Sequence, residues 1–211
     1  MKNYLFIVIL SVFVAVLQAQ DIKRLPPPET EGGMPLMKAL KNRQTSREFA
    51  ETKLNDQQLS NLLWAADGVN RPETKKRTAP SAMNYQEIDI YITLSEGLYI
   101  YDADQHQITK VSGEDLRAKT GIQDFVANAP LTLVYVADYS KMSKSEDATR
   151  ESYSMADAAF ISQNVYLFCA SENLNTGVRA YIDKEKLTKA MNLKPTQHIM
   201  LAQSVGFPKT K

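Results

Sequence analysis

A single cysteine, Cys169, occurs in the 211 residues of this chain, so no intramolecular disulfide can form. It lies in an apolar run, residues 165–170, which is typical of a small buried side chain. The two histidines, His106 and His198, have no Cys or His neighbours at metal-ligand spacing. Neither a P-loop nor a Rossmann glycine pattern occurs, and no nucleophile motif frames a serine. These absences argue against a zinc-binding protein, a P-loop or Rossmann nucleotide-binding protein and a serine hydrolase.

An excess of charge of one sign is also missing. The 25 basic and 24 acidic side chains give a formal net charge of +1, which argues against a nucleic-acid-binding protein. Hydrophobic residues make up 44% of the chain, and neither an internal repeat nor a low-complexity tract is present. The composition therefore predicts one globular domain with a sizeable core.

The first nineteen residues have the pattern of a secretory signal peptide. Lys2 supplies a positive charge, residues 4–16 are apolar apart from Ser11, and Ala19 is a small residue at the expected cleavage site. A membrane anchor is the weaker alternative, because the apolar run is shorter than the ~20 residues that a spanning helix needs. We therefore expect residues 1–19 to be removed and the protein to be exported, periplasmic or secreted, without a stable membrane anchor.

Residues 20–35 are expected to form a flexible tether, because three consecutive prolines and a Gly-Gly pair leave little to bury. The remaining residues, 36–211, alternate between helix and strand patterns. Helical periodicity is expected at 34–43, 56–67, 151–173 and 183–191, and strand patterns at 88–94, 98–101, 107–111, 130–137, 178–182 and 198–205. This order predicts an α+β fold with a mixed or antiparallel sheet flanked by helices.

Two short segments are the best candidates for a functional site. The first, 43–49, places Arg43, Thr45 and Arg47 at the predicted end of a helix. Arginine suits a phosphate, because its planar fork donates two parallel charge-assisted hydrogen bonds. The second, 79–86, is a Pro-Ser turn followed by an amide side chain. The alternatives are a solvated helix end, where basic residues favour the helix dipole, and a simple tight turn before a strand.

These segments, together with four others in the same order, resemble the nitroreductase family of FMN-dependent oxidoreductases. The others are 97–102 with His106, the long helix around 155–167, 176–179 and the closing 203–209. The segment 97–102 resembles the subgroup that contains the azole-forming dehydrogenases. The resemblance implies a homodimer with two FMN sites at the interface between its subunits.

The resemblance also implies roles for individual residues in flavin binding. Arg43 and Thr45, with Gln44 between them, match phosphate ligands, and Arg47 matches a basic residue near the N1/O2 edge of the flavin. Backbone N–H groups of the segment containing Gly177, Val178 and Arg179 match those that face N5. Lys209 matches a further basic residue that binds the phosphate. A turn that lies against the ring, and that the other subunit contributes, is matched by Pro80, Ser81, Ala82 and Asn84.

We therefore expect an exported FMN-dependent oxidoreductase that transfers electrons through flavin N5 to a small, aromatic or conjugated acceptor. NAD(P)H, which most members of that family use, is a possible electron donor, but we expect it to reduce the flavin inefficiently because an exported protein meets little of it. No side chain is assigned a catalytic role, because the flavin carries the chemistry. One alternative is a flavin-binding module that does not turn over, and another is an azole-forming dehydrogenase. Asp157 is either a buried acid near the interface or a solvated helix carboxylate.

Overall fold

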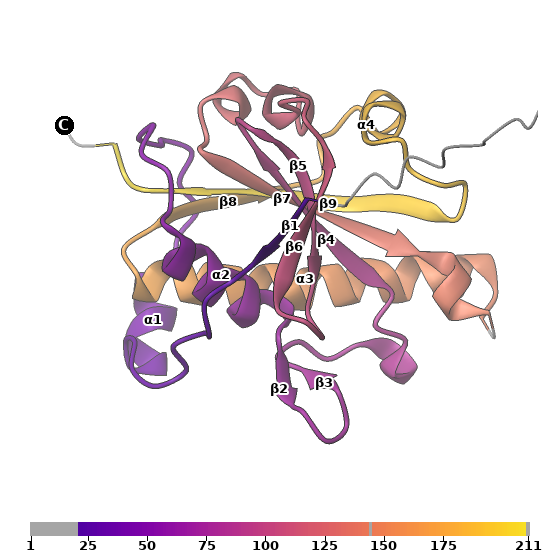
Figure 1. The fold of residues 1–211 in the computed structure, drawn as a ribbon, viewed down its shortest axis with the longest axis horizontal. Coiled ribbons are helices and arrows are strands. Elements are labelled where there is room, and N and C mark those ends of the chain that lie inside the picture. Colours follow the sequence, from indigo (N-terminus) through magenta and orange to yellow (C-terminus); the bar gives the residue numbers. More distant parts are fainter. Residues whose placement is uncertain (1–20, 144, 210–211) are drawn as a thin grey trace, which may run out of the picture.

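The structure is a computed structural model that describes residues 21–143 and 145–209 of the 211-residue chain. The expected signal peptide, residues 1–19, lies outside the described residues. Every strand pairing in the main sheet is antiparallel, in the order β1-β6-β5-β4-β7-β9-β8 (Figure 1). Its strands are β1 (Ile22–Arg24), β4 (Ile88–Leu94), β5 (Gly97–Asp102), β6 (Gln107–Ser112), β7 (Leu131–Asp138), β8 (Asn175–Arg179) and β9 (Gln197–Gly206).

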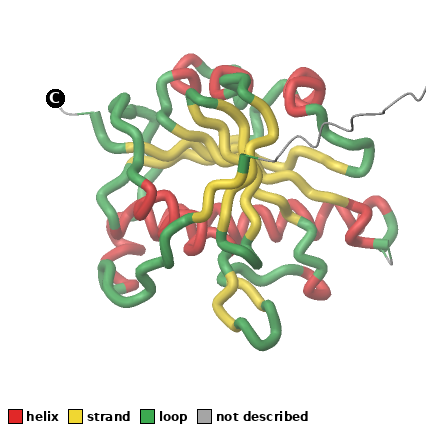
Figure 2. The backbone as a smooth tube through the Cα atoms, viewed as in Figure 1, coloured by secondary structure: helices red, strands yellow, loops and turns green. Residues whose placement is uncertain are grey.

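Helices cover both faces of this sheet, as Figure 2 shows. The helices α1 (Leu36–Asn42), α2 (Asp56–Asp67) and α3 (Asp147–Ser171) lie on one side, and α4 (Lys184–Met191) lies on the other. The remaining elements are a small hairpin and four turns of 3-10 helix: β2 (Val69–Arg71), β3 (Lys76–Arg77), η1 (Ala82–Asn84), η2 (Arg117–Lys119), η3 (Asp124–Ala127) and η4 (Tyr139–Met142). The prediction of an α+β fold is confirmed.

The sheet divides the hydrophobic core into two layers, as its central strand β7 shows. Leu133 and Tyr135 point toward α2 and α3, whereas Val134 and Val136 point toward α4. Alternate side chains of a strand point to opposite faces, so a strand buried on both sides is apolar throughout. The strand expected at 88–94 is β4, in which Ile88, Ile90 and Ile92 face the α2–α3 layer. Tyr91 is buried in the α4 layer, so β4 is covered on both faces and not on one face alone, as its alternating pattern would predict.

The starts of α2 and α4 agree with the sequence, whereas α1 begins two residues later and α3 four residues earlier than expected. Asn55 caps α2 by accepting a hydrogen bond from Gln58 N at 2.8 Å, and the Gln58 side chain accepts one from Asn55 N at 3.0 Å. Asp183 caps α4 by accepting a hydrogen bond from Lys186 N at 3.1 Å. Each cap satisfies a backbone N–H that the helix itself leaves unpaired.

The segment expected to be a flexible tether is different in the structure. Its residues 22–24 form β1 and pair with β6, and Leu25 is buried in the core. The Ser60 hydroxyl donates to Pro26 O at 2.6 Å, and Glu29 N donates to Asn61 Oδ1 at 2.9 Å. The prediction of a flexible tether is therefore wrong for this part of the chain, because the edge of β6 and the surface of α2 supply partners that composition does not reveal.

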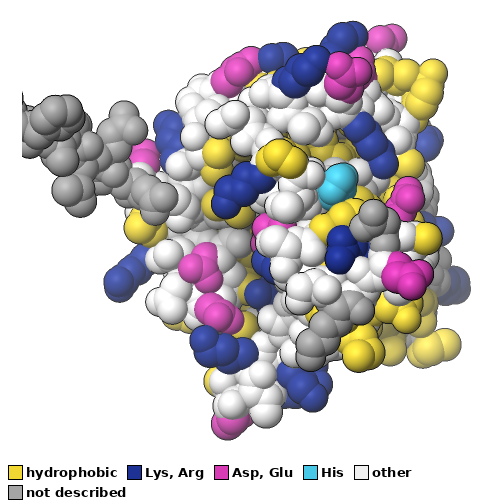
Figure 3. Space-filling model, turned by 90° about the vertical axis from the view of Figure 1, so that its right-hand side faces the viewer, with side chains coloured by type: hydrophobic (Ala, Val, Ile, Leu, Met, Phe, Trp, Pro, Cys, Tyr) yellow, Lys and Arg dark blue, Asp and Glu magenta, His cyan; other side chains and the backbone are white. Residues whose placement is uncertain are grey.

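The surface of the described residues mixes charges of both signs. On the face shown in Figure 3, basic and acidic side chains lie next to each other, in agreement with the net charge of +1. Within the described ranges, no helix is both long and apolar enough to cross a bilayer.

Candidate functional site

The first candidate segment packs directly on strand β8. Ser46 N donates a hydrogen bond to Thr176 O at 2.9 Å. At Gly177 the two backbones approach so closely that an added Cβ would lie 3.2 Å from Ser46 O and 3.4 Å from Thr45 Cγ2. A side chain at Gly177 would push the segment away from the strand. The structure therefore brings together residues 43–47 and 177–179, which the resemblance assigned to one cofactor.

Tyr166 of α3 connects these two segments. Its hydroxyl oxygen lies 2.8 Å from Thr45 Oγ1 and accepts a hydrogen bond from Val178 N at 3.1 Å. The Arg43 guanidinium stands over its ring, 5.2 Å from the centroid. Sequence reasoning treated Tyr166 only as part of the long helix. The signal it missed was a phenol hydroxyl on the buried side of the long helix.

The contact of Tyr166 changes the expectation for the backbone of β8. The resemblance assigned the N–H groups around Val178 to the edge of a flavin. In the structure the Val178 N–H already has an acceptor, the Tyr166 hydroxyl. The Val178 N–H therefore bonds β8 to α3 and is not free to donate to a flavin.

A second aromatic ring contacts two cations. Phe125, in η3, has the Arg47 guanidinium 5.8 Å from its ring centroid and the Arg179 guanidinium at 5.6 Å. The ring of Phe49 lies 6.3 Å from that of Phe125. A guanidinium within about 6 Å of an aromatic face is attracted by the ring quadrupole. No sequence signal pointed to Phe125, because the connection between β6 and β7 shows no motif.

Lys209 joins the same end of the molecule through the last segment of the described chain. Phe49 forms an isolated antiparallel bridge with Pro208, and Ala50 N donates to Phe207 O at 2.9 Å. Lys209 follows this bridge and is exposed. Gln44, also exposed, lines a polar groove of about 460 Å³ together with Tyr166 and Pro208.

We refer to Arg43, Arg47, Arg179 and Lys209 as the basic cluster. Within residues 21–143 and 145–209, none of the four forms an ion pair with a carboxylate. Other basic residues of the fold, such as Arg77 and Arg117, do form such pairs. Several cations gathered without acids create a positive potential that favours binding of an anion.

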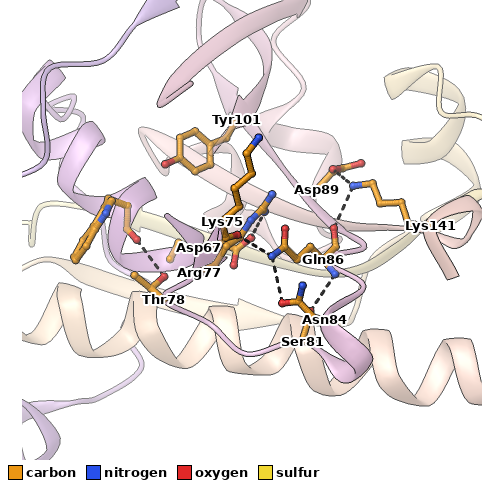
Figure 4. Close-up of polar contacts among 12 residues, drawn as sticks. Asp67, Lys75, Arg77, Thr78, Ser81, Asn84, Gln86, Asp89, Tyr101 and Lys141 are labelled. Atoms are coloured by element: carbon orange, nitrogen blue, oxygen red, sulfur yellow. Dashed lines mark hydrogen bonds and ion pairs between the residues drawn. The ribbon is translucent and has the colours of Figure 1, made fainter. Parts of the chain in front are cut away.

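The Pro-Ser turn lies at a different place, where Gln86 braces it (Figure 4). The Ser81 hydroxyl accepts a hydrogen bond from Gln86 N at 3.0 Å, and Gln86 Nε2 donates to Lys75 O at 3.0 Å. Met83 and Asn84 have φ angles of 52° and 56°, and that of Gln86 is 48°. Left-handed residues other than glycine are rare and concentrate at functional sites, because the surroundings must hold them.

Asp157 holds the turn against α3 by accepting a hydrogen bond from Ala82 N at 2.8 Å. Its side chain is buried beside Glu87, which is completely buried. Burial raises the pKa of both carboxyl groups. Of the two alternatives for Asp157, the structure therefore selects the buried acid.

A pocket of about 230 Å³ opens between this turn and the β2–β3 hairpin. Pro80, Ser81 and Asn84 line it, together with a buried ion pair in which Arg77 Nη1 lies 2.6 Å from Asp67 Oδ2 (Figure 4). Burial raises the pKa of Asp67 to about 7, although the Arg77 charge acts in the opposite direction. Among the described residues, no three His, Cys, Asp or Glu side chains form a group that could hold a metal ion.

The turn and the basic cluster contact α3 at separate points. The turn is anchored at Asp157, and the loop 43–47 is anchored at Tyr166. The two anchors are nine positions apart on α3, which separates them by about 14 Å along the helix axis. Within one chain, the two candidate segments therefore contact α3 at separate points and do not converge on one site.

Comparison with known proteins identifies the fold. A sequence model of the nitroreductase family matches residues 40–207. This chain belongs to the nitroreductase family. In sequence, this chain is 41% identical to a nitroreductase from Ralstonia eutropha JMP134 of known crystal structure. The two structures superpose with a TM-score of 0.87, and the match covers 90% of each chain. A nitroreductase of Methanocaldococcus jannaschii is 29% identical over 176 residues, which are 78% of this chain and 88% of that protein.

More distant nitroreductase-fold structures share the fold alone. The Escherichia coli microcin synthetase McbBCD is 17% identical, with a TM-score of 0.69 and coverage of 89% of this chain and 79% of that one. An NADH oxidase of Clostridium acetobutylicum is 20% identical, with a TM-score of 0.59 and coverage of 82% and 89%. Membership of the nitroreductase family makes this an oxidoreductase fold, and the resemblance found in the sequence is confirmed at the level of the family.

Proposed function

We propose that this nitroreductase binds FMN at the basic cluster and works as an FMN-dependent oxidoreductase. The observation that carries the proposal is the basic cluster itself, four cations that have no acid partner among the described residues. Arg43, Arg47 and Arg179 lie in the two segments that meet at Gly177, and Lys209 follows the bridge between Phe49 and Pro208. The Arg43 guanidinium and the Lys209 ammonium suit a phosphate, and the close approach at Gly177 leaves backbone rather than side chain beside the loop 43–47. When bound, FMN would supply hydride and electron transfer through its N5 atom.

The residues of the chain would hold and orient this cofactor. Arg43, Thr45 and Lys209 would bind the phosphate, with Gln44 at the edge of the adjoining groove. Arg47 would provide positive charge at the pyrimidine edge of the ring, where reduction places negative charge. No described side chain is assigned to proton transfer in this proposal.

We further propose that the protein is a homodimer in which the Pro80–Asn84 turn reaches the flavin of the other subunit. The separation of the turn and the loop along α3 supports this arrangement, because one chain alone does not bring them together. An apolar exposed stripe also runs along α3 and α1, including Tyr153, Phe160 and Met37. Exposed apolar residues on adjacent helices are typical of a subunit interface.

The test is the colour of the purified protein. With FMN bound it should be yellow, lose the colour with a chemical reductant and regain it with a conjugated acceptor such as a quinone. A protein that binds no FMN would contradict the proposal. A yellow protein whose reduced form transfers no electrons to any acceptor would instead be the binding module that does not turn over.

The electron donor and the compartment are proposals from the sequence. Residues 2–19 favour export, and free NAD(P)H is scarce outside the cytoplasm, so we propose that NAD(P)H reduces the flavin only slowly. A kcat/KM well below ~10⁴ M⁻¹s⁻¹ in stopped-flow reduction is expected. Cell fractionation with N-terminal sequencing should find a mature chain that begins at Gln20 in the exported fraction. Rapid saturable reduction by NADH or NADPH, or an unprocessed cytoplasmic protein, would contradict these statements.

The subgroup stays a prediction. The azole-forming resemblance rests on β5, which pairs with β4 and β6 as an ordinary sheet strand. The likeness to the microcin synthetase, at 17% identity, concerns the fold. We therefore propose an oxidoreductase activity for this protein. Azole formation is a separate activity, to be assayed with a thiazoline-containing peptide.

A further inference from the structure

One cation of the basic cluster is buried without a counter-charge. Arg179 is 7% exposed, and its three hydrogen bonds all go to uncharged acceptors. Nε donates to Thr120 O at 3.0 Å, Nη2 donates to Thr120 Oγ1 at 2.6 Å, and Nη1 donates to Ser204 Oγ at 3.0 Å. Among the described residues no carboxylate pairs with it, and burial alone lowers its pKa, to about 10. The guanidinium therefore remains charged at neutral pH.

The surroundings of Arg179 are shaped for a guanidinium. A Cβ at Gly121 would lie 2.5 Å from Arg179 Nε, so only glycine leaves room for the side chain. The Phe125 ring lies 5.6 Å from the Arg179 guanidinium and 5.8 Å from that of Arg47, which is exposed to solvent. The fold thus places two positive charges next to one ring, an exposed one at Arg47 and a buried one at Arg179.

A buried charge without a partner is costly unless something offsets it. Desolvation of a guanidinium costs several kcal/mol, and neutral acceptors and one aromatic ring recover only part of this. The remaining field acts strongly on nearby charges, because the interior screens it less than water does. An additional negative charge bound near the basic cluster would lower the energy of Arg179, and the arginine would in turn stabilise that charge.

We propose that Arg179 is an electrostatic positioning residue whose buried charge makes the site bind reduced FMN more tightly than oxidised FMN. The inference rests on the proposed function, because it requires FMN at the basic cluster. The reduced flavin carries more negative charge on its pyrimidine edge than the oxidised flavin does. The hydrogen bonds of Arg179 hold its charge in place before reduction, so no reorganisation opposes the effect.

Two variants remove the uncompensated charge by opposite routes. Arg179→Met removes the cation, whereas Ser204→Asp keeps the arginine and places the missing carboxylate next to Nη1. Arg179→Lys retains the charge without the fork. The matched control is Arg117→Met, which removes an arginine from the same layer whose charge Asp115 already balances at 2.7 Å. For each protein we would measure the melting curve, the affinity for oxidised FMN and the redox equilibrium against a reference dye.

Arg179→Met and Ser204→Asp should both shift the preference from reduced toward oxidised FMN about tenfold, which corresponds to ~30 mV for a two-electron couple. Arg179→Lys should keep most of the preference, and Arg117→Met all of it. If either neutralised variant fails to fold, the other carries the test. An unchanged equilibrium in a folded, FMN-binding neutralised variant would overturn the inference and leave the proposed function intact. A parent protein that binds no FMN would overturn both.

Discussion

The hydroxyl oxygen of Tyr166 lies 2.8 Å from Oγ1 of Thr45, a residue 121 positions earlier in the chain. The same oxygen accepts a hydrogen bond from Val178 N. One phenol group thus fixes the relative positions of α3, the loop after α1 and β8. These are three of the elements that hold the basic cluster, so its geometry depends on a residue that carries no charge.

Tyr166→Phe should destabilise the fold and weaken FMN binding together. The variant loses the contact with Thr45 and leaves Val178 N–H without its acceptor, which typically costs ~1–3 kcal/mol. Urea unfolding monitored by circular dichroism measures the stability, and FMN fluorescence titration measures the affinity. Tyr153→Phe is the control, because Tyr153 lies exposed on the same helix. Equal losses in both variants would show that the hydroxyl of Tyr166 has no positioning role.

Arg43→Ala should weaken FMN binding by ~1.5–3 kcal/mol, the usual loss for a hydrogen bond to a charged group. Riboflavin lacks the phosphate, so its affinity should change much less. Lys38→Ala is the control, since it removes an exposed cation from the same helix. Isothermal titration with both flavins gives the comparison. If the substitution weakens FMN and riboflavin equally, Arg43 does not bind the phosphate.

Phe160→Glu should disrupt the proposed dimer. Phe160 is 48% exposed on α3 within the apolar stripe, and placing a carboxylate in a packed interface costs ~2 kcal/mol or more when the residue is central. Sedimentation velocity at micromolar protein should show a shift toward monomer and a parallel loss of bound FMN. Val111→Glu, an exposed apolar position on β6, should leave both unchanged. A flavin-loaded monomer in the parent would contradict the shared site.

His106 should make the protein less stable at mildly acidic pH. Its Nε2–H donates to the Ser60 hydroxyl at 2.7 Å, since that hydroxyl donates to Pro26 O, and its Nδ1 accepts from the Tyr101 hydroxyl at 2.9 Å. This neutral arrangement is partly buried, and burial lowers the pKa of His106.

The direction of the effect follows from this lowered pKa. The unfolded chain takes up the proton near pH 6.5, before the folded chain does. The contribution of His106 to stability is therefore complete above about pH 6.5 and is lost as the pH falls through the lower folded value. His106→Asn, which tolerates the φ of 47° found here, should remove this part of the pH dependence. Urea unfolding between pH 5 and 8 measures it, with His198→Asn as control for loss of a histidine elsewhere. Parallel curves for parent and His106→Asn would contradict the prediction.

The sequence predicted most of the elements but not the packing of the N-terminal segment. The caps of α2 and α4 and the alternation of β4 depend on residues next to each other in the chain, so local pattern was sufficient. Residues 22–24 show no strand pattern of their own. They form β1 because β6 presents a free edge, which exists only after the sheet has assembled.

The sequence by itself determined the family, the order of the elements and the two segments of the candidate site, because these depend on residue types at short spacing. Tertiary structure decided the rest. It placed the Tyr166 hydroxyl within hydrogen-bond distance of Thr45 and Val178, Phe125 next to Arg47 and Arg179, and the Pro-Ser turn at Asp157, away from the basic cluster. It also decided that Arg179 is buried with no acid partner among the described residues. Whether a charge is paired depends on which distant residues the fold brings within a few ångströms, and the spacing of residues along the chain does not contain that information.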